Sequence, residues 1–349
     1  MAHKDMFSQS ASIIDQAWPQ QDIEFVSVCP MCKSAQRTLA HCGVKDWAFA
    51  CAPGSWDYWL CDDCSSLYLD PRPTVDSIGR AYSTYYTHED ETVAQGVRSG
   101  FKLRLRNECL FHWLGIDQEP RFNHSFGRYL SVLKPMIPRK FPLDQLARLP
   151  RGKLLDVGCG SGDFLLAAQA IGWQVRGIEI DTKAVAAACC KGLSVQHGSF
   201  ELLCEYRSLF ECIVCSHVIE HVHEPLQLLS SLVNALKPGG SLFIAYPNPN
   251  SIVRRWFGSH WRGLEAPRHL CLPSLEVLQT ELRKLGMRGI KVYPSSIHTF
   301  GASMRIKSGR SGWVASVFNK LLNTISSVLP FTANQDIIEI VCDQNMLNQ

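Results

Sequence analysis

The sequence contains no long uninterrupted run of apolar residues. A membrane-spanning helix needs about 18 of them, so we expect no such helix. The N-terminus, MAHKDMFSQSASIIDQAW, also lacks the basic start and apolar run of a secretory signal, which favours a cytoplasmic protein. A charge excess is missing too, since 35 Lys and Arg stand against 32 Asp and Glu, for a net charge of +3. A dedicated nucleic-acid binder has a strong basic excess, so we expect no nucleic-acid partner.

Cysteine, by contrast, is abundant, with 15 among the 349 residues. Without a secretory signal, these cysteines are better explained as free thiols or metal ligands than as disulfides. Apolar residues make up 46% of the chain, which is enough for a full-sized α/β domain with a smaller module beside it.

From Lys153 onward, apolar segments alternate with helical patterns. We expect strands at 153–157, 173–180, 193–198, 210–218 and 241–247. We expect helices at 163–172, 182–190 and 225–237, the last of them stopped by Pro238-Gly239-Gly240. Strands that alternate with helices form parallel βαβ units, so the pattern predicts an α/β fold with a doubly wound sheet.

Three glycines at alternate positions follow the first of these strands, in the stretch KLLDVGCGSGDFL (153–165). A P-loop would need Gly-Lys-Ser/Thr, but Gly162 is followed by Asp163. A dinucleotide fingerprint would need its third glycine one position later, and Asp163 at the helix start would repel a diphosphate. Asp156 adds a second negative charge just before the turn. Both acids suit a ligand that carries an ammonium and a sulfonium group.

A further carboxylate, Glu179, closes the second strand about 20 residues beyond the turn. A carboxylate at this place accepts hydrogen bonds from both ribose hydroxyls of a bound nucleotide. Sites for dinucleotides and for S-adenosylmethionine share this need, so Glu179 alone does not separate the two.

Five segments occur in a fixed order: DVGCGSGDF, GIEID, HGSFELL, FECIVCSHVIEHVHEP and LKPGGSLFIAYPN. In this order and spacing they resemble the class I S-adenosylmethionine-dependent methyltransferases over about residues 150–300, and more narrowly the branch with ubiquinone-pathway and sugar-pathway enzymes. The resemblance implies a Rossmann-like sheet of seven strands, with an antiparallel last strand at 334–344, and S-adenosyl-L-methionine as co-substrate. It also implies a binding site, with Asp156, Gly158 and Gly160 around the methionine end, Glu179 on the ribose, Ile180, Ser199 and Phe200 at the adenine, and Ser216 and His217 towards the sulfonium.

Two Cys-x-x-Cys pairs, Cys29–Cys32 and Cys61–Cys64, lie 28 residues apart. This layout is typical of a zinc ribbon, in which each pair forms a turn and all four thiolates bind one tetrahedral ion. Four cysteine ligands leave no open position on the metal, so we expect structural zinc in a small β-rich module. Three other residues between the pairs could replace a ligand: His41, Cys42 and Cys51.

Methyl transfer needs a general base only where the acceptor must lose a proton, and histidine serves near neutral pH. We expect His269 to be this base, with His260 and His221 as alternatives. The other interpretation is that His269 and the neighbouring Arg268 only brace their loop.

In the resembled branch, the segment that matches Glu220 and His221 holds two glutamates and a histidine that bind magnesium. Here His217 replaces the first glutamate, which argues against magnesium because this ion prefers oxygen ligands. The alternative role of Glu220 and His221 is packing and hydrogen bonding at a helix start.

We expect five regions: an extension at 1–24, a zinc ribbon at 25–75, a helical connector or lid at 76–150, the methyltransferase core at 151–300, and a helical insertion with the last core strand at 301–349. Helical patterns occupy 100–115 and 126–136 in the connector and 311–331 in the tail. The tail helix would pack as a lid or, alternatively, make a peripheral membrane contact.

The expected function is in-line transfer of a methyl group to a small polar acceptor such as a sugar or nucleotide-sugar, with S-adenosylhomocysteine as product. The rival interpretation is a zinc-ribbon adaptor with a non-catalytic methyltransferase-like domain. The intact Asp156, glycine turn and Glu179 argue against that rival. A nicotinamide dehydrogenase would need the glycine spacing that is missing.

Overall fold

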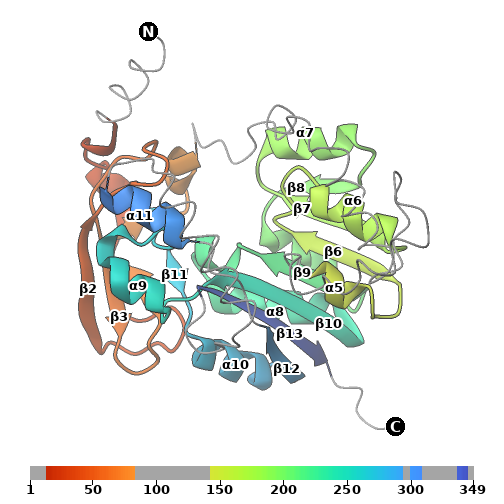
Figure 1. Cartoon of the computed structure of the whole chain (residues 1–349). Helices are drawn as coiled ribbons and strands as arrows, with labels where there is room; N and C mark the ends of the chain where they lie inside the picture. Colours follow the sequence, from red (N-terminus) through yellow and green to blue (C-terminus); the bar gives the residue numbers. More distant parts are fainter. Residues whose placement is uncertain (1–12, 83–141, 294–298, 309–335, 345–349) are drawn as a thin grey trace, which may run out of the picture. The chain divides into compact units, whose positions relative to one another are not determined.

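The computed structural model describes residues 13–82, 142–293, 299–308 and 336–344 (Figure 1). The chain divides into two compact units, a first unit with residues 1–85, 216–233 and 244–349 and a second with residues 86–215 and 234–243. This division cuts across the expected domain boundaries, which stay predictions. The helices expected at 100–115, 126–136 and 311–331 lie outside the described residues.

The second unit is built of parallel strands joined by helices. Its elements are α5 (Leu143–Leu146), β6 (Lys153–Val157), α6 (Asp163–Ala170), β7 (Gln174–Glu179), α7 (Thr182–Cys190), β8 (Val195–His197), the 3-10 helix η4 (Phe200–Glu205) and nearly all of β9 (Phe210–Ser216). β6 pairs in parallel with both β7 and β9, and β7 pairs in parallel with β8. Figure 1 shows α6 and α7 beside these strands. The predicted βαβ pattern is confirmed.

The complete sheet has seven strands in the order β12-β13-β10-β9-β6-β7-β8. The strands not yet named are β10 (Leu236–Pro247), β12 (Met287–Tyr293) and β13 (Ile337–Gln344). β13 pairs antiparallel with β12. The mostly parallel sheet of seven strands is therefore confirmed, and so is the antiparallel last strand.

The helix α8 (Pro225–Ala235) ends two residues earlier than the sequence predicts, and β10 begins at Leu236. Leu236 is 1% exposed, and Lys237 Nζ forms an ion pair with the Glu211 carboxylate near the start of β9. These contacts hold the stretch against the sheet. The stretch Pro238-Gly239-Gly240 belongs to β10, with Gly239 in a left-handed conformation at a φ of 80°.

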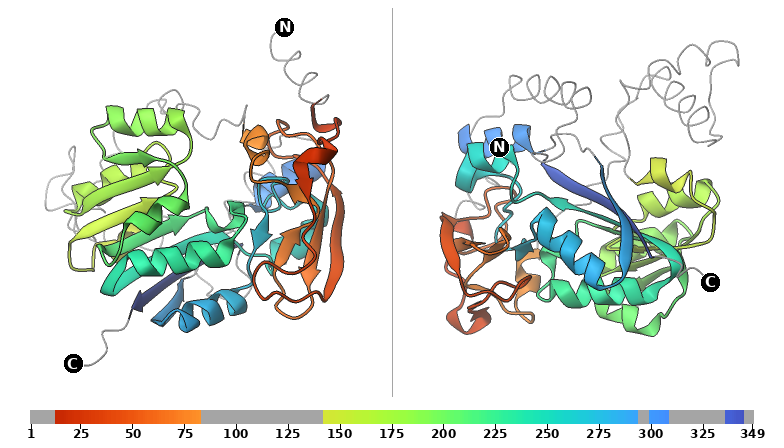
Figure 2. Two further views of the ribbon diagram at one scale, coloured as in Figure 1. Left: turned by 180° about the vertical axis from the view of Figure 1, so that it is seen from behind. Right: turned by 90° about the horizontal axis from the view of Figure 1, so that it is seen from below.

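The cysteine-rich region contains a four-stranded sheet in the order β11-β4-β3-β2. β2 (Arg37–Val44), β3 (Trp56–Cys61) and β4 (Leu67–Leu69) are successive antiparallel strands, and Figure 2 shows β2 and β3 side by side. This confirms the β-rich module. The fourth strand, β11 (Cys271–Leu272), comes from much later in the chain and pairs antiparallel with β4. The sequence does not predict it, because a strand of two residues has no recognisable pattern.

The other elements of the first unit are short. They are η1 (Gln20–Asp22), β1 (Ile23–Glu24), β5 (Arg72–Pro73), η2 (Ile78–Tyr82), η5 (Ile219–His221), α9 (Ile252–Phe257), η6 (Gly258–His260), α10 (Leu275–Lys284) and α11 (Phe300–Ser308). The core of this unit mixes distant segments, since Trp56 and Tyr58 belong to one buried cluster with Trp261. The Tyr58 hydroxyl lies 2.5 Å from the Leu264 carbonyl and 2.9 Å from the His269 carbonyl. Core packing thus fixes the backbone of the loop that carries His269.

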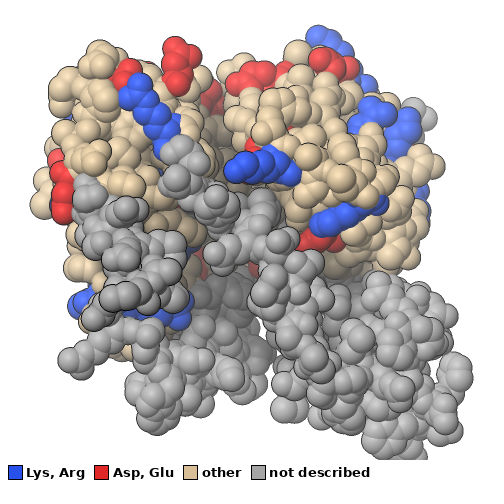
Figure 3. All heavy atoms as spheres, turned by 90° about the horizontal axis from the view of Figure 1, so that it is seen from above, with Lys and Arg blue, Asp and Glu red and all other residues tan. Residues whose placement is uncertain are grey.

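The described surface shows no accumulation of one charge on the face in Figure 3, where Lys and Arg are interspersed with Asp and Glu. Among the helices that the structure describes, none is both long and apolar enough to span a bilayer.

Candidate functional site

The turn between β6 and α6 uses all three of its glycines. Gly158, Gly160 and Gly162 have φ angles of 75°, 53° and 81°, in the left-handed region that other residues rarely adopt. Gly158 N donates a hydrogen bond to the Ile178 carbonyl in β7 at 2.8 Å. These angles reverse the chain in a short space, and α6 begins directly afterwards at Asp163. The backbone conformation of the turn therefore favours glycine at these three positions, whatever ligand the turn binds.

Gly162→Ala should destabilise this unit more than Gly192→Ala, although both positions have a similar φ. A Cβ at Gly162 would lie 2.3 Å from Leu193 Cδ1, whereas a Cβ at Gly192 would meet no atom within 4 Å. We expect the left-handed backbone to cost about 1 kcal/mol at both sites, and overpacking to cost about 1–3 kcal/mol more at Gly162. Urea unfolding of both variants measures the difference, and equal losses would contradict the steric argument.

Two carboxylates, Asp156 and Glu179, lie on neighbouring parallel strands next to this turn. They are 5% and 9% exposed. Burial, and then the charge of Glu179, raise the pKa of Asp156 well above its usual value. The backbone holds the other carboxylate: its Oε2 accepts a hydrogen bond from Gly160 N at 2.8 Å, and its Oε1 accepts from Ile180 N at 2.8 Å and Asp181 N at 2.9 Å. The glycine turn and Glu179 thus fix each other.

The residues expected at the adenine differ in how much surface they offer. Ile180 is 69% exposed, so its apolar side chain is open for a flat ring to pack on it. Ser199 precedes η4 and Phe200 begins it, but Phe200 is 8% exposed. Ile180 therefore offers an open apolar surface and Phe200 only an edge. The contacts of all three with an adenine stay predictions.

Ser216 ends β9, and His217 follows it in a left-handed conformation with a φ of 57°. This conformation is strained for a residue with a side chain. His217 Nδ1 lies 3.1 Å from Glu220 Oε1. Desolvation lowers the pKa of His217, but the hydrogen bond and charge of Glu220 outweigh it and raise the pKa. The expected place of Ser216 and His217 near a sulfonium stays a prediction.

Three predicted or considered site residues meet in the first unit. Donor atoms of Glu220, His221 and His269 lie within 4.8 Å of one another. The two imidazole rings touch edge to face, with centroids 4.6 Å apart. Tyr82, at the end of η2, places its hydroxyl 2.9 Å from His221 Nδ1. The fold thus gathers a carboxylate, two imidazoles and a phenol from three segments of the chain.

His269 is held as a neutral imidazole in a defined tautomer. Its Nδ1 lies 2.7 Å from the Gly263 carbonyl, which only accepts, so Nδ1 carries the proton. Nε2 then keeps a lone pair and lies 3.7 Å from Glu265 Oε2, which is beyond hydrogen-bond distance. Burial lowers the pKa of His269 to about 4, against the opposing effect of Glu265. At neutral pH, Nε2 is therefore unprotonated and keeps its lone pair, while burial disfavours the imidazolium form.

Unfolding should become easier as the pH falls from about 6.5 towards 4, in part because of His269. Its folded-state pKa of about 4 lies below the ordinary value of 6.5, so the unfolded chain binds a proton that the folded chain excludes. The stabilising contribution is complete above the unfolded pKa and decreases as the pH approaches the folded pKa, by about 3 kcal/mol in total. Urea unfolding at several pH values should show a smaller decrease for His269→Asn than for wild type. Parallel curves would contradict this assignment.

A buried arginine, Arg268, directly precedes His269 and has no exposed surface. Its Nη2 lies 2.5 Å from Asp46 Oδ1, and its Nε lies 3.2 Å from Glu265 Oε1. Glu265 also forms an ion pair with Arg262. Burial by itself would raise the pKa of the Glu265 carboxyl, but the cationic groups around this carboxyl lower its pKa well below the usual value. The sequence suggests Arg268 only as a brace and does not point to Asp46, because no spacing pattern links residues so far apart.

Glu220 Oε2 is buried and accepts no hydrogen bond in the described part of the chain. One oxygen of the Glu220 carboxylate lies within 4.8 Å of donor nitrogens of His221 and His269, so the three residues could hold a cation. Two nitrogen donors and one oxygen suit zinc or iron(II) better than magnesium, which prefers an all-oxygen shell.

His260, the second predicted base, ends η6, and its ring stacks on Trp47 with centroids 6.4 Å apart. Its ring contact is therefore with Trp47, whereas the rings of His221 and His269 contact each other. The structure brings together two of the three candidate bases.

The two cysteine pairs form matching turns. Lys33 N donates to the Cys29 carbonyl at 2.9 Å, and Ser65 N donates to the Cys61 carbonyl at 2.9 Å. Both donor residues have a left-handed backbone conformation, with φ angles of 64° and 58°. The same backbone pattern thus presents each pair of thiols.

The four sulfur atoms lie within 4.8 Å of one another, with Cys29 and Cys64 3.6 Å apart and Cys32 and Cys61 3.4 Å apart. Zinc–sulfur bonds of about 2.3 Å place the sulfurs of a tetrahedral site about 3.8 Å apart. The arrangement therefore fits zinc. The residues considered as replacement ligands lie in other contacts or are exposed: His41 with Arg254, Cys51 with Asp46, and Cys42 at the surface.

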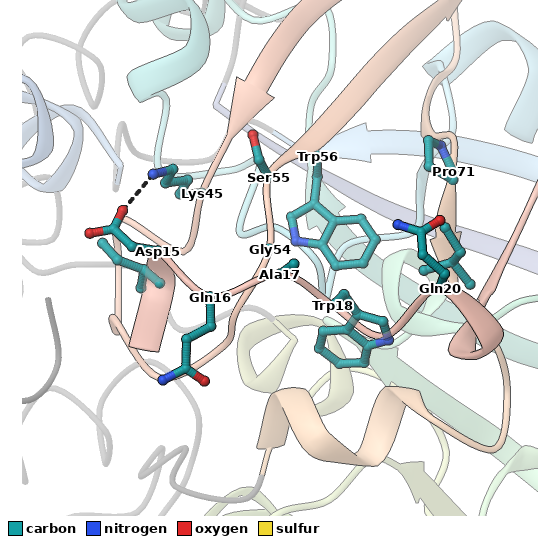
Figure 4. Close-up of a pocket in the computed structure, with 12 residues that line it drawn as sticks. Asp15, Gln16, Ala17, Trp18, Gln20, Lys45, Gly54, Ser55, Trp56 and Pro71 are labelled. Atoms are coloured by element: carbon teal, nitrogen blue, oxygen red, sulfur yellow. Dashed lines mark hydrogen bonds and ion pairs between the residues drawn. The ribbon is translucent and has the colours of Figure 1, made fainter. Parts of the chain in front are cut away.

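A hollow of about 320 Å³ lies in the N-terminal part of the first unit (Figure 4). On one side Trp18 and Trp56 meet edge to face, with ring centroids 5.5 Å apart. On the other, Asp15 Oδ1 lies 2.6 Å from Lys45 Nζ. Both indoles are nearly buried and no predicted site residue lines the hollow, so we assign it no ligand.

Comparison with known proteins identifies the central segment. Residues 134–292 match a family model described as a methyltransferase domain. A ubiquinone biosynthesis O-methyltransferase from Xanthomonas campestris pv. campestris is 35% identical over 107 residues, which are 29% of this chain and 45% of that protein. One from Bordetella avium is 29% identical over 171 residues, 44% of this chain and 71% of that protein. The chain thus spans about half the length of the first of these relatives.

A solved S-adenosylmethionine-dependent methyltransferase from Archaeoglobus fulgidus is 20% identical and covers 62% of this chain and 99% of its own, with a TM-score of 0.42. A likeness of this degree carries no conclusion about the site.

Proposed function

We propose that this chain, whose residues 134–292 match a methyltransferase domain, is a class I enzyme that transfers the methyl group of S-adenosylmethionine to a small polar acceptor. The observation that carries this proposal is the pair of carboxylates beside the glycine turn. Glu179 receives the ribose hydroxyls, and Asp156 lies at the methionine end. The exposed Ile180 packs on the adenine.

The reaction is an in-line displacement. A lone pair of the acceptor forms the new bond to the methyl carbon while the bond between carbon and sulfur breaks, and S-adenosylhomocysteine leaves as a neutral thioether. The acceptor loses its proton to His269 Nε2, whose lone pair is available because Nδ1 is bonded to the Gly263 carbonyl. Alignment of the two reactants supplies much of the rate.

The acceptor is a hydroxyl-bearing metabolite, with a sugar or nucleotide-sugar as the first candidate. An oxygen acceptor is supported by the two curated relatives, which are named as O-methyltransferases. Those names also make a phenolic quinone precursor the second class to test.

The four cysteines hold a structural zinc ion, since they leave it no open position for chemistry.

The test is calorimetric titration of the zinc-loaded full-length protein with S-adenosylhomocysteine. We expect micromolar binding with one ligand for each chain. A screen of sugars, nucleotide-sugars and phenols, read by release of S-adenosylhomocysteine, then identifies the acceptor. Absence of binding by a folded, zinc-containing protein would overturn the proposal in favour of the adaptor interpretation.

A further inference from the structure

The guanidinium of Arg268 connects segments that are far apart in the sequence. Its Nη1 donates a hydrogen bond to the Ala81 carbonyl at 3.0 Å, and its Nη2 contacts Asp46 Oδ1 at 2.5 Å. The backbone of the same residue takes part as well, because its carbonyl lies 3.1 Å from His221 Nδ1. One buried residue thus holds the end of η2, the loop after β2 and the imidazole of η5.

Asp46 is the fixed end of this connection. It has no exposed surface, and its carboxylate accepts hydrogen bonds from three backbone N–H groups of its own loop. These come from Phe49 at 3.2 Å, Cys51 at 3.0 Å and Ala52 at 3.0 Å. A carboxylate held by so many donors has little freedom, so it is a rigid anchor for Arg268.

Tyr82, His221 and His269 form the histidine cluster, and each of them lies next to Arg268 or next to a residue that Arg268 contacts. Tyr82 directly follows Ala81, and His269 directly follows Arg268. His221 lies between the Tyr82 hydroxyl and the Arg268 carbonyl, at 2.9 Å and 3.1 Å from its Nδ1. We propose that Asp46 and Arg268 are positioning residues, which set the orientation of Tyr82, His221 and His269 for the proton transfer. This inference rests on the proposed function of His269.

Stability alone is a poor explanation for such a pair. Taking two charges out of water is costly, and replacing a buried ion pair by apolar residues of similar volume is often neutral or stabilising. Breaking only one partner, in contrast, leaves an uncompensated charge and is strongly destabilising. A variant with both charges replaced leaves neither member of the pair as a lone buried charge, although it also removes the acceptor of three backbone N–H groups and one cationic contact of Glu265.

The decisive variant is Asp46→Leu combined with Arg268→Met, compared with wild type and with Asp46→Asn. The matched control is Asp62→Asn, which removes an exposed carboxylate from the same region, where it accepts a hydrogen bond from Thr38. The readout is the histidine side-chain NMR spectrum of full-length, zinc-loaded protein labelled with [15N]histidine. The signal of the His269 Nδ1–H, bonded to the Gly263 carbonyl, is assigned with His269→Asn.

We expect a slowly exchanging Nδ1–H signal in wild type and in Asp62→Asn. In the double variant this proton should exchange with water at least tenfold faster, or the tautomer should change. Zinc content and the affinity for S-adenosylhomocysteine should stay within about threefold, because neither Asp46 nor Arg268 is among the residues expected to bind zinc or the cofactor, and Asp156, the glycine turn and Glu179 belong to the other unit.

An unchanged Nδ1–H signal in the folded double variant would overturn the inference. A double variant that does not fold would overturn it as well, since the pair would then serve folding. Failure of wild type to bind S-adenosylhomocysteine is a separate result, which overturns the proposed function without changing the NMR comparison.

Discussion

Glu179→Ala should weaken the binding of S-adenosylhomocysteine by on the order of 100-fold or more. The carboxylate of this residue is expected to accept both ribose hydroxyls, and a hydrogen bond to a charged group contributes about 1.5–3 kcal/mol. Two such bonds amount to about 3 kcal/mol or more, which corresponds to a hundredfold change in the dissociation constant. Calorimetric titration of both proteins under the same conditions measures the effect.

The control must account for the structural contacts of Glu179, which also accepts a hydrogen bond from Gly160 N. Glu179→Gln keeps the shape and one carbonyl acceptor, so its affinity should lie between those of wild type and Glu179→Ala. Asp181→Asn alters the neighbouring cap of α7, where Asp181 accepts from Lys183 N at 2.8 Å, and should leave the affinity nearly unchanged. If Glu179→Ala binds as tightly as wild type, the assigned ribose contact is wrong.

Cys61→Ser should remove the bound metal and unfold the four-stranded sheet around it. A structural zinc ion contributes on the order of 10–16 kcal/mol to the folding of a small module, so loss of one thiolate has a large effect. Cys61 ends β3 and belongs to the sheet itself, which links the metal directly to the pairing of β3 with β4. We expect near-complete loss of zinc by elemental analysis and a lower Tm.

Cys42→Ser provides the comparison, because Cys42 is an exposed thiol in β2. Its zinc content and Tm should match those of wild type. Retention of stoichiometric zinc and an unchanged Tm in Cys61→Ser would show that the four thiols are not the metal site.

The parts of the fold that could be predicted are those with a local pattern. Buried parallel strands are short apolar runs, and the turn after β6 needs glycine for its backbone angles, so both are visible in the sequence. The two cysteine pairs are equally local, because each turn contains both of its thiols. Within each pair, the two thiols lie side by side because the short Cys-x-x-Cys spacing places both on one turn.

The rest depends on contacts between segments far apart. Asp46 has no neighbour in sequence that would mark it as the partner of Arg268. Nor does the sequence indicate that His221 and His269 meet while His260 stacks on Trp47. The early end of α8 is a related case, because β10, which belongs to the seven-stranded sheet, already begins at Leu236.

The pairing of β11 with β4 has a consequence for how this gene could have been assembled. The cysteine-rich sheet is not an exchangeable cassette, because its outermost strand is encoded some two hundred codons downstream of the rest. Leu67, Tyr68 and Leu69 of β4 have no exposed surface in the described fold. A recombinant fragment ending at residue 82 would leave this apolar edge open to another copy, and it should self-associate. A gene exchange that moved only the N-terminal sheet would therefore leave β4 without its partner strand β11.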